Sequence, residues 1–187
     1  MLTRLKVGLL FLAIAAIVST GAAFAAEKTT LWHVKGVHPK GYLLDIKAID
    51  ADGKLFDVVA IEEDGNAQLL AVKALSGDRR YDVKVVVSDD RHAPVRAIDA
   101  KGQILDLKAL TPEGKQLDVR AMRRTGSILD IKVFGTLGRY FAVKALSPDG
   151  VMYDVKGLKM NKQRVESTIG SVQIHAHVKA IPPARGL

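Results

Sequence analysis

The sequence predicts an all-β fold, an antiparallel meander of about 12–13 strands joined by short turns. One phrase, an aromatic residue or leucine followed by Asp-Val-Lys-Ala-Leu or a variant of it, occurs thirteen times between Trp32 and Ile181. Apolar and polar side chains alternate within each copy, as in a strand with one buried face. Glycine recurs between the copies, where a tight turn is needed.

The copies follow one another at a nearly constant interval. Measured from one basic position to the next, the interval is 12 residues, except for steps of 14 and 11 in the first half and a step of 11 at the end. One strand and its turn therefore form each repeat. The basic position is filled, in order, by Lys35, Lys47, Val59, Lys73, Lys84, Arg96, Lys108, Arg120, Lys132, Lys144, Lys156, Thr168 and Lys179.

The two faces of each strand differ. One face carries a large apolar residue, then Val, Ile or Leu, then usually Ala, while the other carries Asp, then Lys or Arg. The apolar face requires cover, so we expect the meander to fold over itself as a sandwich or a closed barrel. The repeat is irregular over residues 59–96, and Pro94 inside a strand favours a break there.

The turn residues predict the register of each hairpin. Pro148-Asp149-Gly150 suits a three-residue loop closed by a glycine with positive φ. Ser147 then pairs with Val151, and Lys144 falls opposite Asp154. Large residues meet small ones and basic residues meet acidic ones, so turn chemistry and side-chain complementarity agree.

Continued across the meander, this register predicts a ladder of alternating charges. Asp118 would lie between Lys108 and Lys132, and each exposed pair would contribute roughly 0.2 to 1 kcal/mol. The alternative fold is a β-solenoid with one repeat per coil. It would stack lysines on one another, which is repulsive, so the antiparallel meander is preferred.

Residues 1–25 have the features of an export signal. Two basic residues precede an apolar run over residues 7–18, and Ala23-Phe24-Ala25 matches a cleavage pattern. The run is shorter than the roughly 20 residues of a membrane-spanning helix. We therefore expect an exported protein, periplasmic or secreted, with no transmembrane segment after cleavage. Residues 26–187 would form a single β-repeat domain, which contains no cysteine to form disulfides.

The repeat units also carry a resemblance. Leu105–Leu110, Tyr153–Lys159 and the tail Ala176–Pro182 resemble an uncharacterised family of exported bacterial proteins built from short "LDVKAL" and "YDVKGLK" strands. The resemblance covers nearly all of residues 26–187. It implies a domain of unknown function and transfers no catalytic or binding residue.

Histidines gather in the two terminal segments. His33 and His177 occupy the position that Asp fills in most copies, and His175 lies two residues before His177. If a closed sheet joins its first and last strands, the three imidazoles would meet and could hold zinc or copper. The alternative is that the end strands lack a full set of acidic residues. The acidic turns 50–53 and 62–65 could attract calcium, although Asp and Gly also suit ordinary hairpins.

Basic residues outside the Asp-matched positions are candidates for contacting an anionic partner. They lie in turns and irregular segments, and the alternative is an ordinary solvated surface. The candidates are Arg79, Arg80, Arg123, Arg124, Lys159, Lys162 and Arg164.

The sequence contains no Ser-His-Asp order, nucleophile elbow or phosphate loop, so we expect no enzyme activity and no cofactor. The preferred hypothesis is a non-enzymatic structural or binding module of the cell envelope or extracellular space. Its partner would be an anionic envelope component or another protein, and no nucleic acid is expected. The alternative is a small metal-binding protein or metalloenzyme that uses His33, His175 and His177.

Overall fold

The computed structural model describes residues 30–123, 126–159 and 168–184. These residues form thirteen strands and one short 3-10 helix, and all strand pairs are antiparallel. The elements are β1 (Trp32–Val37), β2 (Leu43–Ile49), β3 (Leu55–Ile61), β4 (Leu70–Ser76), β5 (Arg79–Val86), β6 (Ala93–Ile98), β7 (Ile104–Leu110), β8 (Gln116–Arg123), β9 (Ile128–Phe134), η1 (Thr136–Gly138), β10 (Tyr140–Leu146), β11 (Met152–Leu158), β12 (Thr168–Ile169) and β13 (Val172–Ile181).

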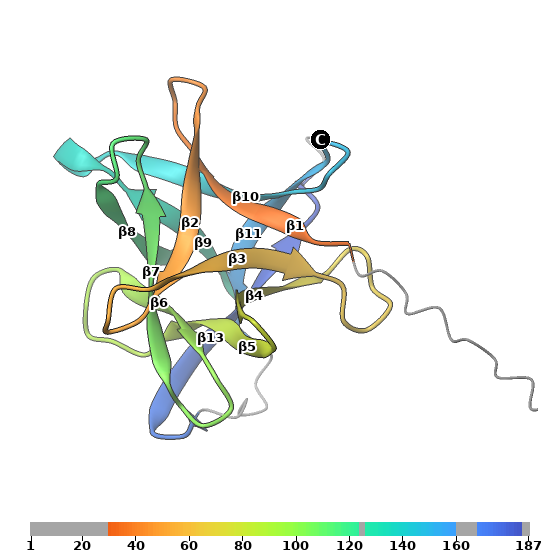
Figure 1. The fold of residues 1–187 in the computed structure, drawn as a ribbon, viewed down its shortest axis with the longest axis vertical. Coiled ribbons are helices and arrows are strands. Elements are labelled where there is room, and N and C mark those ends of the chain that lie inside the picture. The colour runs from red at the N-terminus through yellow and green to blue at the C-terminus, as the bar shows by residue number, and fades with distance from the viewer. Residues whose placement is uncertain (1–29, 124–125, 160–167, 185–187) are drawn as a thin grey trace, which may run out of the picture.

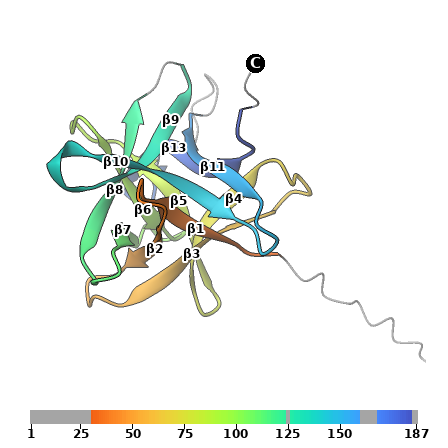
Figure 2. The ribbon, with the colours of Figure 1, turned by 90° about the horizontal axis from the view of Figure 1, so that it is seen from above.

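The predicted all-β, antiparallel and closed architecture is confirmed. The strands run in several directions around one interior (Figures 1 and 2). Each strand except the short β12 has hydrogen-bonded neighbours along both sides. Because every pair is antiparallel, a solenoid with parallel coils is excluded.

Twelve strands fall into four units of three. Within a unit, the second half of each strand pairs with the first half of another, so the three strands close into a triangle. In the first unit, β1 pairs with β2 at Lys35 and Asp45, and β2 pairs with β3 at Lys47 and Asp57. β3 then returns to pair with β1. The units are β1–β2–β3, β4–β5–β13, β6–β7–β8 and β9–β10–β11.

Six longer antiparallel pairs join the units to one another. Each of these pairs takes strands from two different units, and every combination of two units occurs once. The connections therefore follow the six edges of a tetrahedron. The joining pairs are β1–β10, β2–β7, β3–β4, β5–β6, β8–β9 and β11–β13.

The predicted turn chemistry and hairpin register are confirmed near the turns. The Ser147 N–H donates to the Val151 carbonyl at 2.9 Å, and Lys144 faces Asp154. Gly150 has a φ of 87°, in the region that favours glycine.

The predicted continuation of each hairpin is wrong. The hairpin of β2 and β3 pairs over three residues and then opens, so that Ile46 faces Ala109 instead of Val58. An unbroken meander would leave an apolar face and two sheet edges exposed. Opening each hairpin lets the rest of the strand pair with a third neighbour, which closes the structure around one core.

The predicted charge ladder is wrong for the same reason. Asp118 faces Phe134, whereas Lys132 faces Arg120. In five of the six joining pairs, the central contact is between two basic residues, an arrangement that is unfavourable in isolation. These contacts are Lys35 with Lys144, Lys47 with Lys108, Lys84 with Arg96, Arg120 with Lys132 and Lys156 with Lys179.

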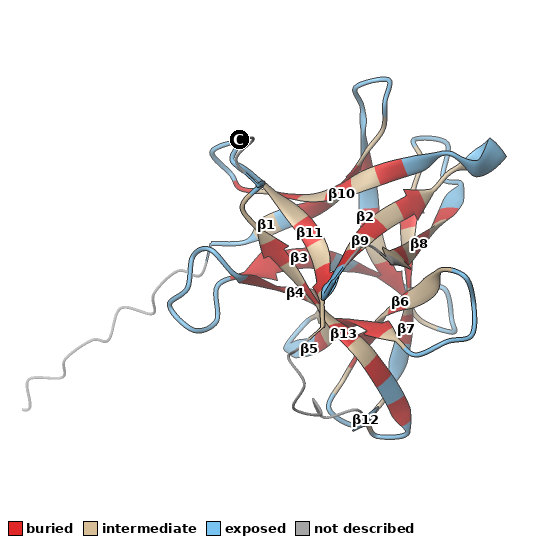
Figure 3. Cartoon of the chain, turned by 180° about the vertical axis from the view of Figure 1, so that it is seen from behind, coloured by how far each residue is buried: buried red, intermediate tan, exposed pale blue. Residues whose placement is uncertain are grey.

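One apolar core fills the interior, and buried positions alternate with less buried ones along the strands (Figure 3). Small residues face large ones, as with Ala48 opposite Phe56. Gly36 lies at an alanine position, where an added Cβ would be 2.9 Å from Val133 Cγ2. Each fully buried Val, Leu or Phe side chain contributes roughly 1.5 to 3 kcal/mol, which makes the core the main source of stability.

Candidate functional site

One corner of the structure departs from the regular repeat. Where the last three units meet, strand ends pair in a closed ring in the order β5, β13, β11, β9, β8, β6. Two other corners carry tight turns such as residues 99–103 and 111–115. This one carries the longer connection 87–92 and a register shift in β13 between Ile174 and Ala176. We call it the irregular corner.

A cavity of about 490 Å³ opens at the irregular corner. Its floor is apolar and includes Ala93 of β6, Ala121 of β8 and Leu129 of β9. Residues 88–91 and His175 of β13 contribute polar groups around it. A cavity of this size with an apolar floor and a few polar groups is typical of a ligand-binding site.

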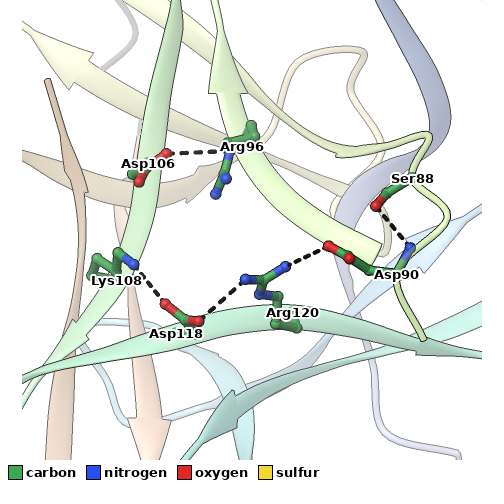
Figure 4. Close-up of polar contacts among 7 residues, drawn as sticks. All are labelled: Ser88, Asp90, Arg96, Asp106, Lys108, Asp118 and Arg120. Carbon is green, nitrogen blue, oxygen red and sulfur yellow. Dashed lines mark hydrogen bonds and ion pairs between the residues drawn. The ribbon is translucent and has the colours of Figure 1, made fainter. Parts of the chain in front are cut away.

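The outer face of each unit carries a second feature, a ring of charged side chains. Each strand supplies one acidic and one basic position, and ion pairs join neighbouring strands. In the β6–β7–β8 ring, Arg96 lies 3.2 Å from Asp106 and Lys108 lies 2.5 Å from Asp118 (Figure 4). The hydrogen bond from Lys108 lowers the pKa of Asp118 by more than partial burial raises it.

A loop residue completes the β6–β7–β8 ring. Pro94 occupies its third acidic position and faces Arg120. The guanidinium of Arg120 lies 3.3 Å from both Asp118 and Asp90, and Asp90 comes from the connection before β6 (Figure 4). The predicted break at Pro94 between two layers is wrong, because β6 continues through it and pairs with β8.

The β4–β5–β13 ring is more deeply buried. Lys84 is only 7% exposed, and its ammonium donates to Asp82 Oδ2 at 2.9 Å and to His177 Nδ1 at 2.6 Å. Because an ammonium has no acceptor, Nδ1 of His177 must be the unprotonated nitrogen. Lys73 pairs with Asp82 and, at 2.7 Å, with Glu63 from the β3–β4 connection. Asp82 therefore pairs with two lysines.

Three ionisable groups of this ring, Asp82, Lys73 and Lys179, have pKa values shifted from their ordinary ones. Burial alone would raise the pKa of Asp82, but hydrogen bonds from Lys73 and Lys84 hold it below its usual value. Burial alone would lower the pKa of Lys73, yet the hydrogen bonds to Asp82 and Glu63 raise it. Burial lowers the pKa of Lys179, and Glu63 only partly opposes the effect while Lys84 and Lys73 add to it.

Lys179 stands apart within the ring. It faces Ala71, which occupies the acidic position of β4. No ion pair between described residues reaches Lys179, since Glu63 and Asp82 pair with the other two lysines. A cavity of about 30 Å³ lies here. It is lined by Glu63, Ala71, Val72, Lys73, Asp82, Val83, Lys84, His177, Val178 and Lys179.

Comparison with known proteins gives one result. The model of a family of unknown function, DUF7486, matches residues 28–181. The chain belongs to this family. The predicted domain of unknown function is thereby confirmed, whereas export stays a prediction. No curated protein and no solved structure matches the chain.

In this member of DUF7486, the three predicted metal-binding histidines do not come together. The first and last long strands are not neighbours: β1 pairs with β2, β3 and β10, and β13 pairs with β4, β5, β11 and β12. His33 faces Val59, His177 lies in the β4–β5–β13 ring, and His175 lines the cavity of the irregular corner. No group of three or more potential ligands occurs among the described residues.

In both turns that were predicted to attract calcium, an acidic side chain makes contacts within the protein. The Asp50 carboxylate accepts hydrogen bonds from the amides of Asp52 and Lys54, at 3.0 and 2.8 Å. This is the ordinary role of Asp in a turn. In the other turn, Glu63 pairs with Lys73.

Three of the predicted anion-contacting side chains lie in the described part of the structure, and Arg79 and Arg80 lie at a different corner from Lys159. Arg79 and Arg80 are exposed at the start of β5. Lys159 lies at the irregular corner, where its amide donates to the Ser127 carbonyl at 2.8 Å. Arg123 ends β8, and its side chain lies outside the described part of the structure. Arg124, Lys162 and Arg164 also lie outside the described residues.

The sequence analysis did not single out Lys84, Lys132 and Lys179 among the repeated basic residues. It treated all three as matched by carboxylates. The available signal was the residue in the acidic position, because Ala71 and Ala142 break the Asp pattern opposite Lys179 and Lys132. The burial of Lys84 had no signal in its own repeat unit.

Proposed function

We propose that this DUF7486 protein is an exported, non-enzymatic binding module of the cell envelope or extracellular space, and that its partner docks at the irregular corner. The observation that carries the proposal is the concentration of irregular features around one cavity of about 490 Å³. At two other corners, connections such as residues 99–103 and 111–115 are tight turns that serve the fold. A long connection and a strand bulge at one corner favour a specialised surface.

The lining of the cavity defines the chemistry of the partner. Val86, Ala93 and Leu129 offer an apolar floor, while Arg91 and His175 provide donors near it. Asp89 and Asp90 also line the cavity, so the partner is an amphipathic component with an apolar group and a polar head that both donates and accepts hydrogen bonds. The formal charge of +8, or +6 without the first 25 residues, assists approach to an anionic surface.

Export is supported by the features of residues 1–25. Among the described residues, no helix has the length and apolar character needed to cross a membrane. A non-enzymatic role is supported by the ion pairs, which account for most of the repeated Asp and Lys residues in pairing between strands.

Co-sedimentation of the purified protein with envelope fractions of its host, at low and moderate salt, tests this proposal. We expect pelleting that decreases with salt and is lost in an Arg91→Ala, His175→Ala variant. The matched control is Arg79→Ala, Arg80→Ala, which removes two charges from a distant corner and should pellet like the wild type. Protein that stays in the supernatant at both salts, or loss only in the control, would refute binding at the irregular corner.

A further inference from the structure

The charged rings share one register position, which holds an aspartate in seven strand pairs. There the carboxylate accepts a hydrogen bond or ion pair from the lysine or arginine of the neighbouring strand. The pairs are Lys35–Asp45, Lys47–Asp57, Lys73–Asp82, Arg96–Asp106, Lys108–Asp118, Lys144–Asp154 and Lys156–Asp130. Lys179 has Ala71 in this position instead.

The β4–β5–β13 ring has an excess of positive charge. Among the described residues, its three lysines face two carboxylates, Asp82 and Glu63, while the His177 nitrogen that accepts from Lys84 is unprotonated. The ring is also poorly solvated, since Lys84 is buried and Lys179 is half-buried. A charge removed from water is costly unless a counter-charge lies beside it.

The cavity beside Lys179 has the size of a small ligand. Its volume of about 30 Å³ exceeds the roughly 10–15 Å³ that a water molecule needs. All three lysines line it, together with Asp82, Glu63 and Ala71, whose methyl group is shorter than an acidic side chain. Its size suits a water molecule or a small anion, and the three lysines that line it favour the anion.

We propose that this ring binds one small monovalent anion beside Lys179, at the register position that holds an aspartate carboxylate in seven other strand pairs. The ligand class is a halide or a one-carbon carboxylate, and the anion completes the charge balance of the ring. Lys179 is its principal partner. The proposal does not depend on the function suggested for the irregular corner, which lies around other residues.

Thermal unfolding at fixed ionic strength tests the site. Sodium gluconate, whose anion is too large for the cavity, is replaced stepwise by sodium chloride in one series and by sodium formate in another. We expect the Tm to rise by about 2 to 4 °C in at least one series, as a ligand that binds only the folded state requires. A Tm that is independent of both anions would overturn the proposal. A response to chloride alone identifies a halide site, and a response to formate alone identifies a carboxylate site.

Two matched substitutions locate the effect. Lys179→Met removes the principal charge and should abolish the dependence on the anion. Lys132→Met is the control, because Lys132 also faces an alanine, Ala142, but lies in another ring. We expect it to retain the full dependence. Equal dependence in both variants would identify a general salt effect and contradict the site.

A third substitution replaces the anion with a side chain. Ala71→Asp should raise the Tm in gluconate and remove the response to chloride or formate. Ala71 is only 3% exposed, so this variant is informative only when it folds. The linewidth of the ³⁵Cl resonance gives an independent readout of chloride binding. Excess broadening by the wild type should be lost in Lys179→Met and kept in Lys132→Met, and the reverse pattern would refute binding at Lys179.

Discussion

The β6–β7–β8 and β4–β5–β13 rings both lack a strand aspartate beside a basic residue, but they differ in their exposure to solvent. The first lacks Asp in one acidic position, at Pro94, and the second in two, at Ala71 and His177. Each receives a carboxylate from a neighbouring loop, Asp90 or Glu63. In the first ring, the side chain of Asp90 is 63% exposed. In the second, Lys84 is buried.

The two rings contain similar ion pairs, but those ion pairs should contribute differently to the free energy of unfolding. Exposed ion pairs contribute little, because water already solvates both partners and salt screens them. A buried lysine that loses its carboxylate has no solvent to replace it. The first ring should therefore act mainly on strand register, whereas the second should control stability.

The largest loss of stability is expected when the carboxylate that pairs with two lysines is removed. Of the described partners, Asp82→Ala leaves Lys84 with His177 and Lys73 with Glu63. We expect a loss of about 3 kcal/mol in the free energy of unfolding, as for other buried pairs that lose one partner. The measurement is equilibrium unfolding in urea.

Asp118→Ala is the matched control for that experiment. Asp118 also holds two basic residues, Lys108 and Arg120, but their side chains are 24% and 27% exposed, against 14% for Lys73 and 8% for Lys84. We expect a loss of at most about 1 kcal/mol. Similar losses for the two variants would mean that burial does not distinguish the rings.

The sequence predicts the local part of this architecture well. The Pro148-Asp149-Gly150 turn defines a register in which Lys144 faces Asp154, and the structure has that pairing. Both effects act within one hairpin, where turn geometry and side-chain size leave one solution.

The long-range part cannot be derived from the same reasoning. Lys47 faces Lys108, a contact between like charges that a complementarity argument rejects. It forms because closure around one core requires strands from every unit to meet, and burial of apolar side chains outweighs an exposed repulsion.

The candidate sites were predictable only in part. Ala71 and Pro94 are visible departures from Asp in the sequence, but the carboxylates near them come from loops whose paths the repeat does not define. The cavity at the irregular corner combines Ala93, Leu129 and His175, which lie far apart in the sequence. Only the tetrahedral pairing brings these positions together.

Acid titration tests whether the carboxylates of both rings stabilise the folded state. Hydrogen bonds outweigh burial and lower the folded-state pKa of Asp82 below its usual 3.8. A carboxylate with a lowered pKa stabilises the fold above its unfolded pKa, and this contribution is lost as the pH falls through the folded pKa. We expect the free energy of unfolding to fall mainly below pH 3.8, and less steeply in Asp82→Asn than in the wild type.

The titration is read from urea unfolding curves across acidic pH, with Asp118→Asn as the companion variant. The pKa of Asp118 is also lowered, through the hydrogen bond from Lys108. Its substitution should therefore reduce the acid dependence in the same direction. A wild type whose stability rises on acidification through this range would contradict the sign derived from both groups.

The smallest effect concerns the loop carboxylate of the exposed ring. Asp90→Ala removes one partner of Arg120, and Pro94→Asp should supply another in register from β6. We expect Asp90→Ala to cost less than about 1 kcal/mol, since the pair is exposed. The loss should be smaller when Pro94→Asp is already present, which a double-mutant cycle in urea measures directly. Arg120 is then held by the strand instead of by the loop. If the two substitutions act additively, Asp90 does not replace the missing acidic residue of the ring. The conformation of the loop would then be related to the irregular corner and not to Arg120.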